Sequence, residues 1–225
     1  ALAADGRIYV GSKGELGYLD TSAANGSHYI SLLHLIPQHQ RNFQDVRQTF
    51  TSPQGVYFIS RDYIFLLQQD QQIRVWTTNS AFLKAFWLNN RLIVREEGRG
   101  LLELIQGEFR LLPGSEQFGQ TSVFMLESYD QHTLVVGSRE GELFLLDDNG
   151  ARRWQTDIDD ELADAMLYSG IRLSNGDYAL GTTQNGLYII SPQGRLKSHI
   201  NKEFGLVDQN IRALYQDHQQ GLWLA

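Results

Sequence analysis

Residues 171–200 read IRLSNGDYALGTTQNGLYIISPQGRLKSHI. Three turns that contain glycine, Ser174–Gly176, Gln184–Gly186 and Pro192–Gly194, divide this run into four short apolar segments. Asn-Gly pairs tolerate the positive φ that two-residue hairpin turns require, and Pro-Gln-Gly combines a fixed φ with a permissive one. The run therefore predicts four antiparallel strands joined by tight turns.

The second of these segments belongs to a repeat. An apolar triplet followed by Gly or Ala occurs four times, and two degenerate copies lie between residues 56 and 95. The residues that follow the triplets lie about 43 positions apart on average, within the spacing typical of propeller blades. The six triplets are Ile8–Val10, Val56–Phe58, Leu92–Val94, Leu134–Val136, Tyr178–Leu180 and Leu222–Leu224.

Four-stranded units of this length cannot bury both of their faces alone, so they stack radially. The sequence therefore predicts an all-β fold, a β-propeller of four-stranded antiparallel blades of about 43 residues. Each triplet is expected to form an inner strand, packed on its neighbours through Tyr9, Tyr57, Val135 and Trp223. One short helix is expected over 159–167, with Leu162, Ala163 and Met166 at helical spacing.

Counting blades gives five repeats and a stub over residues 1–225. The chain opens at one inner strand, 7–11, and closes at the equivalent strand, 222–225. We therefore expect residues 1–225 to be one propeller segment of a larger protein, cut in mid-repeat at both ends. On this interpretation Ala1–Ala4 is an arbitrary boundary rather than the scar of a signal peptide.

Composition narrows the function classes. The chain has 26 acidic and 19 basic residues, a net charge of −7, and no clustered Lys and Arg that would neutralise phosphates, so nucleic acid is not an expected partner. It has no cysteine, which excludes disulfides, cysteine-ligated metals and thiol catalysis. Its apolar runs are of about five residues, too short to span a bilayer.

No catalytic or metal-binding motif is evident. The sequence has no phosphate-binding loop, GxSxG, HExxH or complete calcium-loop pattern. Its densest acidic run is expected to be a solvated loop and helix start, although a cation or sugar site is the alternative. The carboxylate pairs Glu96–Glu97 and Asp147–Asp148 suit acid/base catalysis poorly, because adjacent strand residues point to opposite faces. The acidic run consists of Asp157, Asp159, Asp160, Glu161 and Asp164.

The histidines are spread over separate repeats without ligand spacing, and the aromatic residues fit packing between blades at least as well as sugar stacking. We therefore assign no catalytic residue, metal or cofactor. The sequence singles out no ligand-binding residue; loops at one mouth of the channel are the expected place for a ligand. The histidines are His28, His34, His39, His132, His199 and His218.

The C-terminal quarter carries a more specific signal. Residues 175–187, NGDYALGTTQNGL, and 204–225, FGLVDQNIRALYQDHQQGLWLA, resemble the two-component regulator propeller repeat. Weaker copies at 11–16 and 137–143 keep the Gly-Ser start and the second glycine, whereas the copies around Ile59 and Arg95 lose the marker glycine.

In that family, propellers form the extracytoplasmic sensing region of membrane-anchored proteins whose output module is a histidine kinase or a diguanylate cyclase. The resemblance implies a periplasmic sensor segment that acts as a homodimer and is not itself an enzyme. The expected ligand is a small molecule, a glycan or a partner protein domain.

Two other functions stay open. One is a protein-interaction scaffold, against which the absence of the Trp-Asp dipeptide of WD repeats counts. The other is a propeller enzyme such as a lyase, lactonase or quinone-dependent dehydrogenase, since a fold alone does not specify chemistry.

Overall fold

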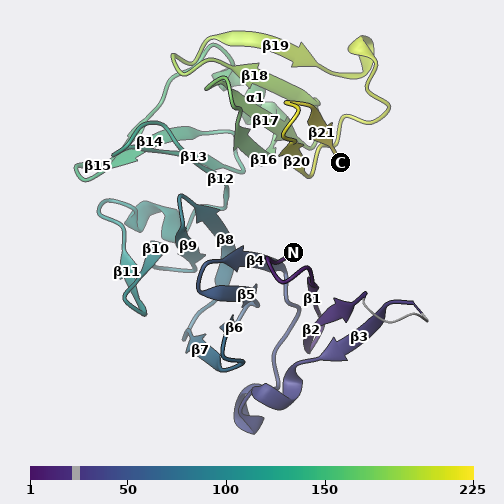
Figure 1. Ribbon diagram of the computed structural model, residues 1–225. Coiled ribbons are helices and arrows are strands. Elements are labelled where there is room, and N and C mark those ends of the chain that lie inside the picture. The colour runs from purple at the N-terminus through teal and green to yellow at the C-terminus, as the bar shows by residue number, and fades with distance from the viewer. Residues whose placement is uncertain (22–25) are drawn as a thin grey trace. The chain divides into compact units, whose positions relative to one another are not determined.

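The computed structural model describes residues 1–21 and 26–225 (Figure 1). The chain divides into two compact units, Ala1–Glu97 and Gly98–Ala225. No helix among the described residues is both long enough and apolar enough to cross a membrane.

The first unit is built from short antiparallel strands with two 3₁₀ turns. β1, β2 and β3 form a three-stranded sheet, and β4 to β7 form a four-stranded sheet in sequence order. The elements are β1 (Ile8–Ser12), β2 (Glu15–Asp20), β3 (His28–Ser31), η1 (Leu33–Leu35), η2 (Gln38–Gln40), β4 (Gln48–Ser52), β5 (Gly55–Ile59), β6 (Tyr63–Gln68), β7 (Ile73–Thr77), β8 (Phe82–Leu88) and β9 (Arg91–Glu96).

The second unit continues the pattern. β12 to β15 and β16 to β19 form four-stranded sheets in sequence order, β20 and β21 form a two-stranded sheet, and β10 pairs antiparallel with β11. The elements are β10 (Gly100–Ile105), β11 (Glu108–Leu111), η3 (Glu116–Gly119), β12 (Val123–Ser128), β13 (Leu134–Ser138), β14 (Leu143–Asp147), β15 (Gly150–Arg153), α1 (Asp159–Ala165), β16 (Leu167–Arg172), β17 (Tyr178–Thr182), β18 (Leu187–Ile190), β19 (Leu196–Ile200), η4 (Lys202–Phe204), β20 (Leu214–Gln216) and β21 (Leu222–Leu224).

The sheet of β16 to β19 confirms the four strands predicted from residues 171–200. Each of its three turns places a glycine at positive φ: Gly176 at 89°, Gly186 at 75° and Gly194 at 79°. In the first turn the Asn175 side-chain oxygen accepts from the backbone N–H of Asp177 at 3.0 Å, as Asx turns do. The all-β class and the four-stranded antiparallel units are therefore confirmed.

The apolar triplets lie in β1, β5, β9, β13, β17 and β21. β13 and β17 are buried at every position, as expected of strands covered on both faces. In the second unit, Trp154 packs edge-on against Tyr178 and Tyr129, with ring centroids 5.5 and 5.8 Å apart. These aromatic contacts join consecutive sheets of the second unit around one core.

One packing prediction is wrong. Tyr9, Tyr57 and Val135 are buried as expected, but Trp223 is 64% exposed, and its indole N–H donates to Asp217 at 2.7 Å. Alternate residues of a strand face opposite sides. Leu222 and its alternate neighbour Leu224 pack on the sheet of β17 and β18, whereas nothing in the described chain covers the face that carries Trp223.

The predicted helix is present as α1, and it ends two residues earlier than expected. Leu162 and Ala165 are its buried residues, whereas Ala163, expected on the apolar side, is exposed. Met166 follows the helix at a φ of 56° and so ends it.

Candidate functional site

The acidic run lies where α1 begins, as expected. Asp159 accepts from the backbone N–H and the hydroxyl of Thr156 at 3.1 and 2.7 Å, and Asp157 accepts from the Leu196 N–H at 3.1 Å. Asp160 and Glu161 are exposed in the first turn. These carboxylates serve the loop and the helix start, and among the described residues no group of three or more His, Cys, Asp or Glu could hold a metal ion.

The two carboxylate pairs point apart. Glu96 is buried and accepts from the Thr78 and Ser80 hydroxyls, whereas Glu97 lies 3.4 Å from Arg61. Glu96 and Glu97 therefore contact different partners and do not face a common site. Asp147 likewise pairs with Arg152, and Asp148 next to it is exposed.

The histidines occupy separate elements, and one of them has a defined structural partner. His199 stacks on Tyr188 with centroids 4.2 Å apart and planes 2° from parallel, and its Nε2 lies 2.8 Å from the Asn185 carbonyl. His28 lies in β3, His34 and His39 lie in 3₁₀ turns, and His132 lies next to a turn. No ligand set is formed by these side chains within the described residues.

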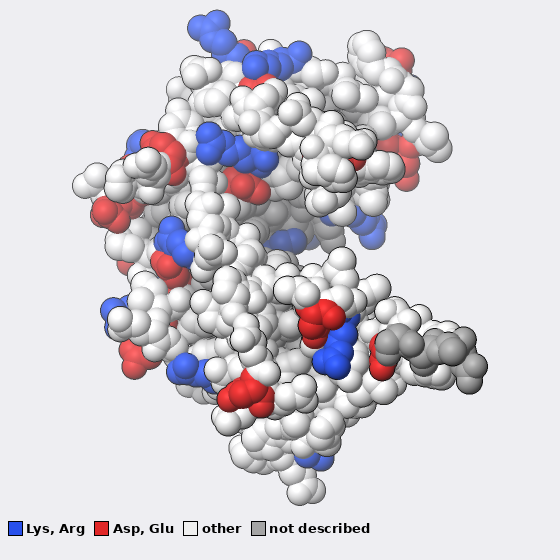
Figure 2. Space-filling model, in the orientation of Figure 1, with Lys and Arg blue, Asp and Glu red and all other residues white. Residues whose placement is uncertain are grey.

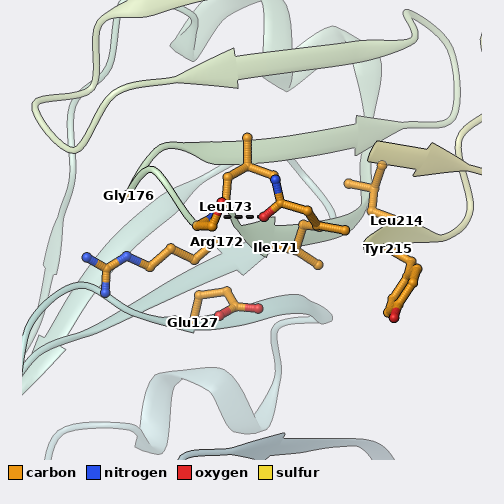
Figure 3. Close-up of a pocket in the computed structure, with 9 residues that line it drawn as sticks. Glu127, Ile171, Arg172, Leu173, Gly176, Leu214 and Tyr215 are labelled. Atoms are coloured by element: carbon orange, nitrogen blue, oxygen red, sulfur yellow. Dashed lines mark hydrogen bonds between the residues drawn. The ribbon is translucent and has the colours of Figure 1, made fainter. Parts of the chain in front are cut away.

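A pocket of about 660 Å³ lies in the second unit at the ends of three strands that each begin a sheet (Figure 3). β12 contributes Glu127, β16 contributes Ile171 and Arg172, Leu173 follows β16 directly, and β20 contributes residues 214–216. Pockets at strand ends, with apolar walls and few polar groups, are common ligand sites. The lining residues are Glu127, Ile171, Arg172, Leu173, Ser174, Gly176, Leu214, Tyr215 and Gln216.

Strand register explains why these side chains meet. β12, β16 and β20 each pair with the strand that carries the apolar triplet, which is β13, β17 or β21. In each pair, one residue of the first strand lies opposite the middle residue of the triplet. The pairs are Glu127 with Val135, Ile171 with Ala179, and Tyr215 with Trp223. The pocket is therefore lined by equivalent positions of three consecutive repeats.

Glu127 is exceptional at this position. The equivalent residues of the first unit are Phe50, opposite Tyr57, and Phe86, opposite Ile93. Glu127 is therefore the one ionisable acid among five equivalent residues, of which the others are Phe50, Phe86, Ile171 and Tyr215. Packing between sheets is served by an apolar side chain at this position, so a carboxyl group there suggests a binding role.

The environment of Glu127 favours its neutral form. Burial raises the pKa of this carboxyl to about 7, while the backbone N–H and the positive charge of Arg172 lower it. No Lys, Arg or His of the described chain lies within ion-pair distance of the Glu127 carboxylate, and Figure 3 shows the Arg172 side chain extending away from it. The pocket thus contains a largely buried acid that forms no ion pair with Arg172, the cation that lines the same pocket.

The polar groups around the pocket fix its shape. The Tyr178 hydroxyl donates to the Ser128 carbonyl at 2.9 Å, and burial raises the pKa of Tyr178 to about 12, so the phenol stays neutral. Gln216 accepts from the Ser174 N–H at 2.8 Å, which ties the end of β20 to the turn after β16.

A second cavity, of about 560 Å³, lies in the first unit. Its apolar surface comes from Tyr9, Val56 and Trp87, and the Asp5 carboxylate next to it accepts from the Tyr9 hydroxyl at 3.0 Å. Its charged lining residues, Asp5 and Arg7, lie 3.6 Å apart and form an ion pair with each other.

The charged side chains visible in Figure 2 are mixed in sign rather than gathered into a patch of one sign.

No protein-family model and no curated protein sequence matches the chain. Solved structures do match. The extracellular domain of the hybrid two-component system BT4673 from B. thetaiotaomicron has a TM-score of 0.70 at 18% identity over 97% of this chain. The corresponding domain of BT3049 has a TM-score of 0.54 at 16% identity over 99% of this chain.

A propeller of another class is as similar. The WD40 β-propeller domain of Doa1 has a TM-score of 0.70 at 14% identity, covering 97% of this chain and 71% of that one. The chain spans 30% of the BT4673 domain and 38% of the BT3049 domain. The resemblance noted at residues 175–187 and 204–225 is confirmed as a likeness to extracellular domains of two-component systems. At these identities the comparisons establish the fold: the chain has the fold of a β-propeller.

Proposed function

We propose that the chain is part of the extracytoplasmic, ligand-sensing propeller of a membrane-anchored bacterial signalling protein of the two-component histidine kinase type. The observation that carries this proposal is the structural similarity to extracellular domains of hybrid two-component systems over 97% of the chain. The repeat-like residues 175–187 and 204–225 support it from the sequence side.

The Glu127 pocket is the proposed sensing site. A ligand changes an equilibrium only by its difference in affinity for two states, so sensing requires that the pocket differ between two arrangements of the receptor. We propose that these are two arrangements of a homodimer in the periplasm, with a kinase or cyclase module across the membrane. This segment is then a binding module without chemistry of its own, and its ligand is a small molecule, a glycan or a partner domain.

An interaction scaffold is the second candidate, and one observation favours it. The WD40 domain of Doa1 matches this chain with the same TM-score as the BT4673 domain. The fold therefore does not distinguish a sensor from an interaction scaffold. The side of the membrane on which the chain lies does distinguish them.

The chain has no cysteine, so a single introduced thiol reports location cleanly. Ala163 and Ala165 lie two residues apart in α1, the first exposed and the second 2% exposed. The full-length protein carrying Ala163→Cys or Ala165→Cys is treated in spheroplasts with a membrane-impermeant maleimide.

An extracytoplasmic segment predicts labelling of Ala163→Cys in intact spheroplasts and labelling of Ala165→Cys only after denaturation. The wild-type protein corrects for cysteines elsewhere in the full-length chain. Labelling of Ala163→Cys only after lysis would refute the location and favour the scaffold.

A further inference from the structure

We infer that the Glu127 pocket accepts a positively charged nitrogen, a primary ammonium or guanidinium group, with the attached carbon chain lying on Ile171 and Leu214. This inference names the ligand class of the proposed sensing site and so rests on the proposed function.

The charge of the Glu127 carboxylate favours a cationic ligand. The Glu127 carboxylate lies in a pocket of about 660 Å³ that is also lined by Arg172, whose side chain forms no ion pair with Glu127 and extends away from it (Figure 3). A charge removed from water is costly unless it is paired, so an entering cation relieves that cost. A carboxylate or phosphate ligand would instead add a second negative charge beside Glu127.

The walls of the pocket include apolar side chains. Ile171, Leu173 and Leu214 belong to one apolar cluster between the sheets of β16 and β20, and all three line the pocket. They suit the methylene groups next to an amine. Tyr215 is 63% exposed at the rim, where the face of an aromatic ring attracts a cation.

Protonation adds a signature that a purely apolar site would lack. Besides burial, the groups that act on Glu127 are the Arg172 charge and the Arg172 N–H from β16, and the Glu127 charge in turn acts on the Tyr178 phenol of β17. An acid with a pKa of about 7 must release its proton before it pairs with a cation. Cation affinity should therefore fall about tenfold from pH 8 to pH 6.

The test uses isothermal titration calorimetry of the full 225-residue chain with n-butylamine, and with butyrate as the chain-length-matched anion. The variants are Glu127→Gln and, as the matched control, Glu161→Gln in the exposed first turn of α1. Titrations at pH 6 and pH 8, each in two buffers of different ionisation enthalpy, count the protons released.

We expect n-butylamine to bind the wild-type chain and Glu161→Gln alike, about tenfold more tightly at pH 8 than at pH 6, with proton release at pH 6. Glu127→Gln should lose at least tenfold in affinity and all of the proton release, and butyrate should not bind. Equal binding of the amine by wild type and Glu127→Gln, tighter binding of butyrate, or no amine binding at all would overturn the inference.

A second variant guards against a merely unfolded Glu127→Gln. Ile171→Lys places an ammonium group at the equivalent position of the next strand, within the same pocket. It should fold with an unchanged circular dichroism spectrum and no longer bind n-butylamine; undiminished binding by the folded variant would count against the inference. Neither result alters the maleimide labelling of Ala163→Cys, so failure of the ligand class and failure of the proposed location are distinguishable.

Discussion

Replacing Glu127 by Gln should make the protein more stable at high pH and leave it unchanged at low pH. Gln has the shape of the protonated acid and cannot ionise. The pKa of Glu127 is raised by burial from 4.5 to about 7 in the folded protein. Between these two values the folded state binds more protons than the unfolded state, so the free energy of unfolding falls as the pH rises and levels off above pH 7.

The size of the effect follows from the shift. Each pKa unit corresponds to about 1.36 kcal/mol, so the wild-type protein loses at most about 3 kcal/mol between pH 4.5 and pH 7 through this group. Glu127→Gln abolishes that loss. The variant should therefore exceed wild type by less than about 1 kcal/mol at pH 5 and by about 3 kcal/mol at pH 8.

Urea unfolding followed by tryptophan fluorescence at pH 5, 6, 7 and 8 measures this difference, provided that the m value stays constant. Glu161→Gln, at an exposed position, is the control and should track wild type at every pH. A Glu127→Gln variant that is equally destabilised or equally stabilised at pH 5 and pH 8 would show that ionisation of the buried acid is not the cause.

Three further predictions concern packing within the second unit. Gly141→Ala should cost about 2 kcal/mol or more in the free energy of unfolding, because its Cβ would lie 2.2 Å from a carbonyl oxygen of α1 at a φ of +83°; Gly6→Ala, at similar φ with nothing within 4 Å, is the control and should cost less. Tyr178→Phe should cost about 1–1.5 kcal/mol, measured by thermal unfolding, because its hydroxyl donates to a carbonyl of β12; no loss would mean that this bond is replaced by water. Trp154→Ala should cost about 3–5 kcal/mol and Trp223→Ala under about 1 kcal/mol in urea unfolding, since only the first is buried; similar losses would contradict the described exposure.

Strands and turns were predictable because their signals are local. The glycines of the turns at 174–176, 184–186 and 192–194 mark positive φ, and the apolar triplets mark the strands that pack on both faces. The covering of a strand is not local. Trp223 has the sequence pattern of a buried inner-strand residue. It is exposed because no described residue packs on its face of the sheet of β20 and β21.

Predicting the pocket from the sequence requires the strand register as well as the pattern of apolar residues. Glu127 ends the apolar run 123–126, and a charged residue there is a signal that aligning the repeats could have exploited. The pairing of β12 with β13 and of β16 with β17 each contains a register shift near the start, between Val123 and Met125 and between Leu167 and Ser169. Strict alternation counted from the first residue of each strand therefore assigns the wrong face, although Glu127 and Ile171 remain equivalent as the fifth residues of β12 and β16.

The central claim is that occupation of the Glu127 pocket controls an output of the full-length protein. Its most direct test is to measure transcription of the regulated genes in cells whose only copy carries Ile171→Trp, which fills the pocket. Leu196→Trp, at a position 42% exposed on β19, is the control. We expect Ile171→Trp to fix the output at one level and Leu196→Trp to leave regulation unaltered; normal regulation with a filled pocket would refute control through this site.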